Sequence, residues 1–127
     1  MRRLHVVVGA LLFGAFLATG IYMDLSLGHL RDMDQATRMF YRSRHIYILM
    51  AALLHAGIGA YYRMIPGRER IQKLGSLLTV AAGGGLVAAF FTEAVAADLR
   101  SSLSLYSIAA LTLGTTLHLA AGLRRQR

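Results

Sequence analysis

Residues 32–63, DMDQATRMFYRSRHIYILMAALLHAGIGAYYR, contain the pattern that decides the fold. Their first half is charged, with apolar residues recurring at helical spacing, and their second half is an apolar run that holds His55. No Gly or Pro separates the halves, so we expect one helix over 33–62, with Asp32 as its N-cap. At 1.5 Å per residue this helix would be roughly 45 Å long, which exceeds the hydrocarbon core of a bilayer. Its first turns should therefore extend beyond the membrane on the outer side.

Three further apolar runs, over 4–23, 71–94 and 103–123, are each long enough to cross a bilayer. Hydrophobic residues make up 56% of the 127 residues and charged residues 16%, and the charges cluster between the apolar runs. A soluble domain of this size could not bury so much apolar surface. The pattern predicts an all-α, polytopic membrane protein, a single domain over 1–127 with four transmembrane helices in a bundle.

Basic residues lie at the ends of the apolar runs, where they would meet lipid headgroups. We therefore read the net charge of +8 as a topology signal and exclude nucleic acid as a partner. Lys and Arg are more numerous in the N-terminus, the second loop and the C-terminus than in the other two loops, which predicts cytoplasmic termini. The first apolar run is longer than a signal-peptide core, so we expect a retained helix in a bacterial cytoplasmic (inner) membrane.

Two histidines inside the apolar runs are the sharpest candidates for a site. His55 and His118 fall at one predicted depth on two helices that run in the same direction, and small residues flank both. Two imidazoles in this arrangement could ligate a haem b axially. The segment LHAGIG, residues 54–59, also resembles the haem-ligating helix of succinate dehydrogenase membrane anchors, although the four-helix layout departs from their three-helix pattern.

The alternative interpretation gives both histidines a structural role. Each would be neutral and hydrogen-bonded across the bundle to a backbone carbonyl or to a threonine, for which the candidates are Thr112, Thr115 and Thr116. The other two histidines of interest, His5 and His29, fall at or beyond the predicted membrane boundary, so we expect both in solvent.

A second candidate cluster lies near the outer ends of the helices. Its four members are Arg42, Arg44, His45 and Glu93. A carboxylate, two arginines and a histidine at one level could form a proton entry site or bind a headgroup. They could equally form a salt-bridged cap on the bundle, which is the interpretation we favour because charges at helix ends reach the interface at low cost.

Small residues at four-residue spacing form the most frequent pattern, and they allow membrane helices to approach closely. The pairs and runs are Ala10/Gly14, Ala52/Ala56/Ala60, Ala81/Gly85 and Ala110/Gly114.

No motif of a known catalytic class is present. The leading hypothesis is a non-enzymatic membrane protein that acts through helix packing, as a homo-oligomer or as a subunit or assembly partner of a larger membrane complex. The alternative is a haem b-binding electron-transfer or quinone-linked subunit that uses His55 and His118. A third is a small transporter or channel protomer with Glu93 as its main intramembrane charge.

Overall fold

The computed structural model describes residues 1–94 and 102–123 and is all-helical over that part of the chain. Its elements are α1 (Arg2–Leu25), the short 3-10 helix η1 (Gly28–Leu30), α2 (Gln35–Tyr61), α3 (Glu69–Thr92) and α4 (Ser102–Leu123). The predicted loop residues 95–101 and the basic C-terminal residues 124–127 lie outside the described part.

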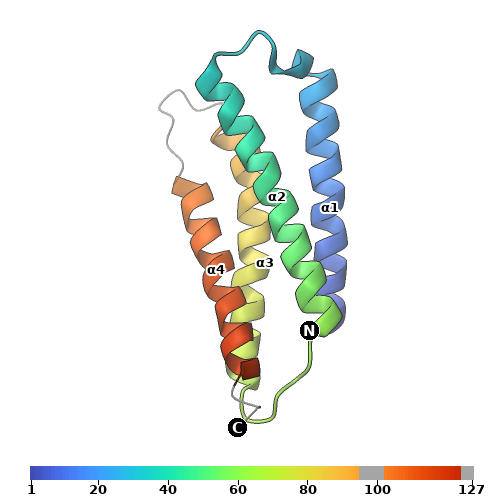
Figure 1. The fold of residues 1–127 in the computed structure, drawn as a ribbon, viewed down its shortest axis with the longest axis vertical. Helices are drawn as coiled ribbons and strands as arrows, with labels where there is room; N and C mark the ends of the chain where they lie inside the picture. The colour runs from blue at the N-terminus through green and yellow to red at the C-terminus, as the bar shows by residue number, and fades with distance from the viewer. Residues whose placement is uncertain (95–101, 124–127) are drawn as a thin grey trace.

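The four long helices form an elongated up-and-down bundle (Figure 1). α1 packs mainly against α2 and α3 mainly against α4, and the two hairpins meet where α2 contacts α3. The N-terminus, the connection over 62–68 and the C-terminal end of α4 lie together at the lower end in Figure 1, called here the terminal end. The connection that carries η1 lies at the opposite end, called here the η1 end.

Three of the described helices are long and apolar enough to cross a membrane: α1, α3 and, in α4, Ser102–Gly122. α2 is not among them, although it is one unbroken helix of 27 residues. Its first half carries Arg38, Arg42 and Arg44, and its second half includes His55 and Tyr61, which lower its hydropathy. The composition of the helices therefore indicates a membrane protein, and three of its helices are long and apolar enough to be spans.

The start of α2 differs from the expectation. Asp32 lies in a turn, and the N-cap is Asp34, whose Oδ1 accepts a hydrogen bond from the Thr37 N–H at 3.0 Å. The Thr37 hydroxyl donates to the other carboxylate oxygen at 2.6 Å. Both aspartates suit an N-cap by residue type, and the turn that follows η1 determines that the helix begins after the second one.

The core is tightest where the backbones of two helices touch. Ile48, Leu86 and Phe90 are fully buried at the centre of the bundle. A Cβ placed on Gly114 would lie 2.7 Å from the carbonyl oxygen of Gly75, so α3 and α4 are in direct backbone contact there. Such contact supplies dispersion attraction between helices without large side chains, and it sets the register in which polar side chains on different helices meet.

Candidate functional site

Three histidine rings gather inside the terminal end of the bundle, each from a different helix. His5 of α1 and His55 of α2 are fully buried, and His118 of α4 is half-buried. The His5 ring lies between the other two, with its centroid 5.0 Å from that of His55 and 5.5 Å from that of His118. The two histidines singled out from the sequence thus join one site through a third histidine.

Two glycines bring α1 against α2 at this level. A Cβ on Gly59 would lie 2.9 Å from the backbone nitrogen of Val6, and a Cβ on Gly9 would lie 3.1 Å from that of Ala56. Without side chains at these positions, the first turns of α1 lie directly on the backbone of α2. His5 is therefore carried into the core beside His55.

The rings are joined to α3 by an unbroken series of hydrogen bonds, called here the histidine chain. His55 Nε2 lies 3.1 Å from the carbonyl oxygen of Thr79, and His55 Nδ1 lies 2.9 Å from Nδ1 of His5. His5 Nε2 lies 2.9 Å from Ser76 Oγ, and Ser76 Oγ lies 3.3 Å from Nε2 of His118. The histidine chain therefore consists of His55, His5, Ser76 and His118, and it ends on the Thr79 carbonyl.

That carbonyl determines the direction of every hydrogen bond in the chain when the histidines are neutral. A carbonyl oxygen can only accept, so His55 Nε2 carries a hydrogen and its Nδ1 is a lone pair. His5 must then donate from Nδ1 and accept at Nε2 from the Ser76 hydroxyl. The one hydrogen of that hydroxyl is now used, so Ser76 accepts from His118 Nε2–H. The Nδ1 of His118 is left as a lone pair.

This lone pair is the only open end of the histidine chain in the part of the protein that the structure describes. The Cδ2–Nε2 edge of the His118 ring packs on Gly75, where a Cβ would lie 3.1 Å from Cδ2, so Nδ1 lies on the other side of the ring. No described residue donates to Nδ1, and this nitrogen is not fully buried. It is therefore an accessible acceptor.

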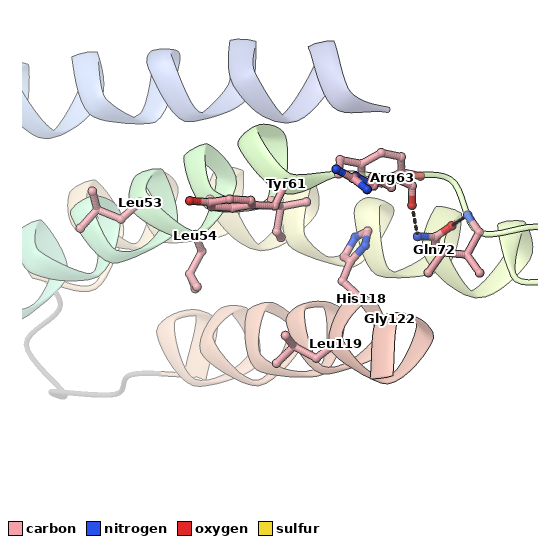
Figure 2. Close-up of a pocket in the computed structure, with 12 residues that line it drawn as sticks. Leu53, Leu54, Tyr61, Arg63, Gln72, His118, Leu119 and Gly122 are labelled. Atoms are coloured by element: carbon pink, nitrogen blue, oxygen red, sulfur yellow. Dashed lines mark hydrogen bonds between the residues drawn. The ribbon is translucent and has the colours of Figure 1, made fainter. Parts of the chain in front are cut away.

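His118 also lines a pocket of about 470 Å³ between α2, α4 and the connection that follows α2. Figure 2 shows the ring projecting from α4 toward Gln72 and the chain around Arg63. Most of the lining is apolar and comes from α2 and α4, including Leu54 and Leu119. The pocket thus offers an apolar volume with one imidazole in its wall.

Gln72 closes one end of this pocket. Its side chain is buried, its Nε2 donates to the Arg63 carbonyl at 2.9 Å, and its Oε1 accepts from the Ile65 N–H at 3.0 Å. Both bonds hold the connection between α2 and α3 against the end of α3 (Figure 2). Because its amide binds this backbone, Gln72 positions the pocket wall.

The prediction that His5 lies in solvent is wrong: its ring is fully buried between two others. His29 is exposed, beside Asp24. Sequence reasoning also missed Ser76 and Gln72. A signal for them was present, because Gln72, Ser76 and Thr79 occupy one face of an otherwise apolar helix at helical spacing. The candidate threonines of α4 instead donate to carbonyls of their own helix, namely Thr112, Thr115 and Thr116.

The positions of the rings bear on haem binding. The His5 ring lies between His55 and His118, and both nitrogens of His55 are engaged. Axial ligation by His55 and His118 would require His5 to leave and the bond to the Thr79 carbonyl to break. Within residues 1–94 and 102–123, no group of three or more His, Asp or Glu side chains is arranged to hold a metal ion.

The second predicted cluster divides in the structure. Arg44 and Glu93 form a buried ion pair, with Arg44 Nη2 3.0 Å from Glu93 Oε2, while Arg42 is exposed on the other side of α2. His45 points toward α1, where it stacks on Phe16 with ring centroids 4.1 Å apart and lies 3.0 Å from Thr19 Oγ1. Only two of the four predicted members therefore meet.

Glu93 ends α3 and caps α4 at the same time. Its Oε1 accepts from the Leu103 N–H at 2.6 Å and from the Ser104 N–H at 3.2 Å, and its Oε2 accepts from the Ser104 hydroxyl. An anion is favoured at a helix N-terminus, where N–H groups lack partners. Burial raises the pKa of Glu93, but these bonds and that from Arg44 outweigh it and hold the pKa below its usual value.

The unused acceptor of His118 therefore distinguishes the histidine chain from the ion pair, in which the carboxylate is enclosed by donors. Comparison of the chain with known protein families, with curated proteins and with solved structures finds no match.

Proposed function

We propose that the chain is an integral membrane protein in which α2 crosses the bilayer together with α1, α3 and α4, with both termini in the cytoplasm of a bacterial cell. Two observations support a spanning α2. Its charged Arg44 is paired with Glu93, and its apolar half packs within the bundle. A buried, paired charge is tolerated in a membrane far better than a lone one.

We further infer that the protein binds a small amphiphilic molecule in the pocket beside His118. The observation that carries this proposal is the position of His118, at the open end of a hydrogen-bond series that is otherwise complete and in the wall of an apolar pocket. Small-molecule sites are typically apolar pockets with a few polar groups that orient the ligand, and an accessible acceptor in an apolar wall fits that description. A hydroxyl group of a bound molecule would supply the missing donor.

The shape of the pocket indicates how such a molecule would reach it. Leu53, Tyr61 and Leu119 lie at its edge and are 61%, 87% and 61% exposed, so this side of the bundle faces the lipid. A molecule could enter sideways from the bilayer, with a polar head at His118 and an apolar tail between α2 and α4. A volume of about 470 Å³ is within the range of small-molecule sites.

Binding of 4-octylphenol to the protein in lipid nanodiscs tests this proposal, with empty nanodiscs as the blank for partitioning. The phenol hydroxyl can donate to His118, and the octyl chain matches the apolar lining. His118→Ala should weaken binding about tenfold, which corresponds to a net hydrogen bond of roughly 1–1.5 kcal/mol. Thr116→Ala is the matched control, because this exposed hydroxyl on the same helix donates only to Thr112 O. Equal affinity in all three proteins would refute the site.

Cysteine labelling tests the topology cleanly, since the chain contains no cysteine. Cysteine at Met64, which is exposed in the connection after α2, should be protected from an impermeant thiol reagent in intact cells. Cysteine at Ser26, beyond the end of α1, should react. The reverse pattern would invert the orientation, and equal labelling at both positions would remove α2 as a span, because α2 is the long helix between them.

Helix packing remains a second candidate function because of one face of α1. Ala10 and Gly14 are exposed on the outside of the bundle, and nothing lies within 4 Å of a Cβ placed on Gly14. A second copy or a partner helix could pack there closely. Gly14→Phe should abolish a dimer detected by cross-linking in membranes if this face is used, and it should leave 4-octylphenol binding unchanged.

The haem-linked alternative makes a separate prediction. A protein that holds haem b between His55 and His118 would show a Soret band with sharp α and β bands on reduction, and His5→Ala would leave that spectrum in place. The binding of an amphiphilic ligand at His118 predicts no Soret, α or β bands. Absorption spectroscopy of protein purified from haem-supplemented cells separates the two.

A further inference from the structure

His118 Nδ1 can change from a hydrogen-bond acceptor to a donor only if the other hydrogen bonds of the histidine chain reverse as well. In the neutral chain every hydrogen bond points from the pocket toward the Thr79 carbonyl, so His118 offers an acceptor. To offer a donor instead, His118 must move its hydrogen to Nδ1 and accept from Ser76 at Nε2. Ser76 then needs a donor, which can only be Nε2–H of His5.

If the hydrogen bonds reverse without an added proton, two nitrogen lone pairs face each other deep in the bundle. The Thr79 carbonyl keeps the hydrogen of His55 on Nε2, so His55 Nδ1 remains a lone pair. A neutral His5 with its hydrogen on Nε2 also has a lone pair on Nδ1. These two nitrogens are 2.9 Å apart, which leaves no room for a water molecule between them, and two lone pairs at that distance repel.

One added proton removes the conflict, and the histidine chain provides its route. The proton bonds to His118 Nδ1, the hydrogen on His118 Nε2 passes to Ser76 Oγ, and the former hydroxyl hydrogen passes to His5 Nε2. His5 now carries hydrogens on both nitrogens and donates to His55 Nδ1 and to Ser76. The positive charge lies on the His5–His55 pair, and His118 is neutral again with an N–H facing the pocket.

The surroundings make this charged state costly unless something stabilises it. Arg2 donates to the Gly59 carbonyl at 3.3 Å beside His5, Arg63 lines the pocket, and the N-terminal amine lies one turn before His5. α3 contributes the uncharged side chains of Gln72 and Ser76, and the titratable group from the connection after α2 is Tyr62, whose ring centroid lies 6.1 Å from that of His5 and 5.7 Å from that of His118. Neither of the ion pairs formed by the described residues involves these cations. A ligand that accepts a hydrogen bond from His118 would supply part of the missing stabilisation.

We infer that the pocket couples ligand type to protonation: a ligand with a hydroxyl donor binds the neutral histidine chain, and a ligand with a carbonyl acceptor binds with uptake of one proton. This inference rests on the binding site proposed above. The protonation change occurs at His5 and His55, which do not contact the pocket, and Ser76 is the residue that connects them to it.

Two probes that share one octylphenyl group test the coupling: 4-octylphenol, which can donate, and 4-octylacetophenone, which can only accept. Affinities are measured in nanodiscs from about pH 5 to about pH 8, where histidine is the side chain that ordinarily titrates. Affinity for the ketone should fall by up to about tenfold per pH unit as pH rises, the limit for one coupled proton. Affinity for the phenol should stay constant or fall as the solution is acidified.

Ser76→Ala is the informative variant, because it disconnects His118 from His5 without changing the pocket wall. His118 can then offer either nitrogen freely, so the ketone should bind with little pH dependence, while Thr116→Ala should retain the slope. Nitrogen-15 NMR of histidine-labelled protein provides an independent readout. The nitrogen-15 chemical shift of His118 Nδ1 should be that of an unprotonated imidazole nitrogen in the phenol complex. It should be that of a protonated nitrogen in the ketone complex.

The outcomes distinguish this inference from the site itself. If His118→Ala affects neither probe, the binding site is wrong and the coupling falls with it. If both probes depend on His118 but the ketone shows no pH slope, the site stands and the coupling is refuted. A slope that survives Ser76→Ala would place the proton on His118 alone, which also overturns the relay through Ser76.

Discussion

The ion pair at the η1 end and the histidine chain at the terminal end both bury polar side chains among apolar helices, with opposite results. The carboxylate of Glu93 is surrounded by donors from Arg44, Leu103 and Ser104. The histidine chain with neutral imidazoles carries no charge to enclose, and it leaves one acceptor open toward a pocket. A buried charge is tolerated only when partners enclose it fully. The Arg44–Glu93 pair therefore fixes the helices at the η1 end, and it is called here the clamp. Neutral imidazoles can exchange hydrogens, which leaves the terminal end able to respond to a ligand.

Removal of the carboxylate should produce the largest loss of stability. Glu93→Gln removes the carboxylate from its buried pair with Arg44, and breaking a buried pair in this way typically costs about 3–5 kcal/mol. Denaturation of the purified protein in mild detergent measures the loss. Arg42→Ala is the control, because Arg42 is exposed and should be close to neutral. If Glu93→Gln is no worse than Arg42→Ala, the clamp has no structural role.

Acid should weaken the same clamp. The pKa of Glu93 lies below its usual value in the folded protein, so the carboxylate contributes stability above the usual pKa of a glutamate. That contribution is lost as pH falls through the lowered pKa. The midpoint of denaturation should therefore drop on acidification in the wild type and drop less in Glu93→Gln. Parallel curves for the two proteins would contradict this assignment.

Filling the contact between α3 and α4 should have the next largest effect. A Cβ on Gly114 would lie 2.7 Å from the Gly75 carbonyl, so Gly114→Ala forces the helices apart at an expected cost of about 1–3 kcal/mol. Gly84→Ala is the matched control, since nothing lies within 4 Å of its added Cβ, and it should stabilise by roughly 0.5–1 kcal/mol. Equal effects of both would mean that the close approach is absent.

Loss of the central histidine should cost less than loss of the clamp. His5→Ala removes two interhelical hydrogen bonds, to His55 and to Ser76, and such a bond in a membrane contributes roughly 0.6 kcal/mol on average. His29→Ala is the control, because that histidine is exposed at the other end. A loss as large as that of Glu93→Gln would show that the histidine chain is also a clamp, and the contrast between the two ends would fail.

The smallest effect is expected at the exposed start of α2. Asp34→Ala removes the cap on Thr37 and should slightly reduce helix content measured by circular dichroism, without changing binding of 4-octylphenol. Hydrogen bonds from the Thr37 hydroxyl and N–H hold the pKa of Asp34 below its usual value. The cap is therefore present above that usual value and is lost as pH falls through the lowered pKa. Asp32→Ala should have no effect, and a larger change there would return the N-cap to Asp32.

The sequence alone determined the parts of this protein that depend on local composition. Long apolar runs bounded by charges can be helices in a membrane and little else, because each must satisfy its own backbone hydrogen bonds there. The absence of Gly and Pro between residues 32 and 56 likewise predicted an unbroken α2. His55 and His118 stood out because imidazoles are costly in such runs.

Only the tertiary structure decided which polar groups meet. Hydropathy placed His5 at a boundary, but the close contact at Gly9 and Gly59 carries it into the core. Arg42 and Arg44 are equivalent by composition, and the rotation of α2 turns one to the outside and the other to Glu93. Register and rotation follow from how four surfaces interlock, and a periodic pattern in one helix does not contain that information.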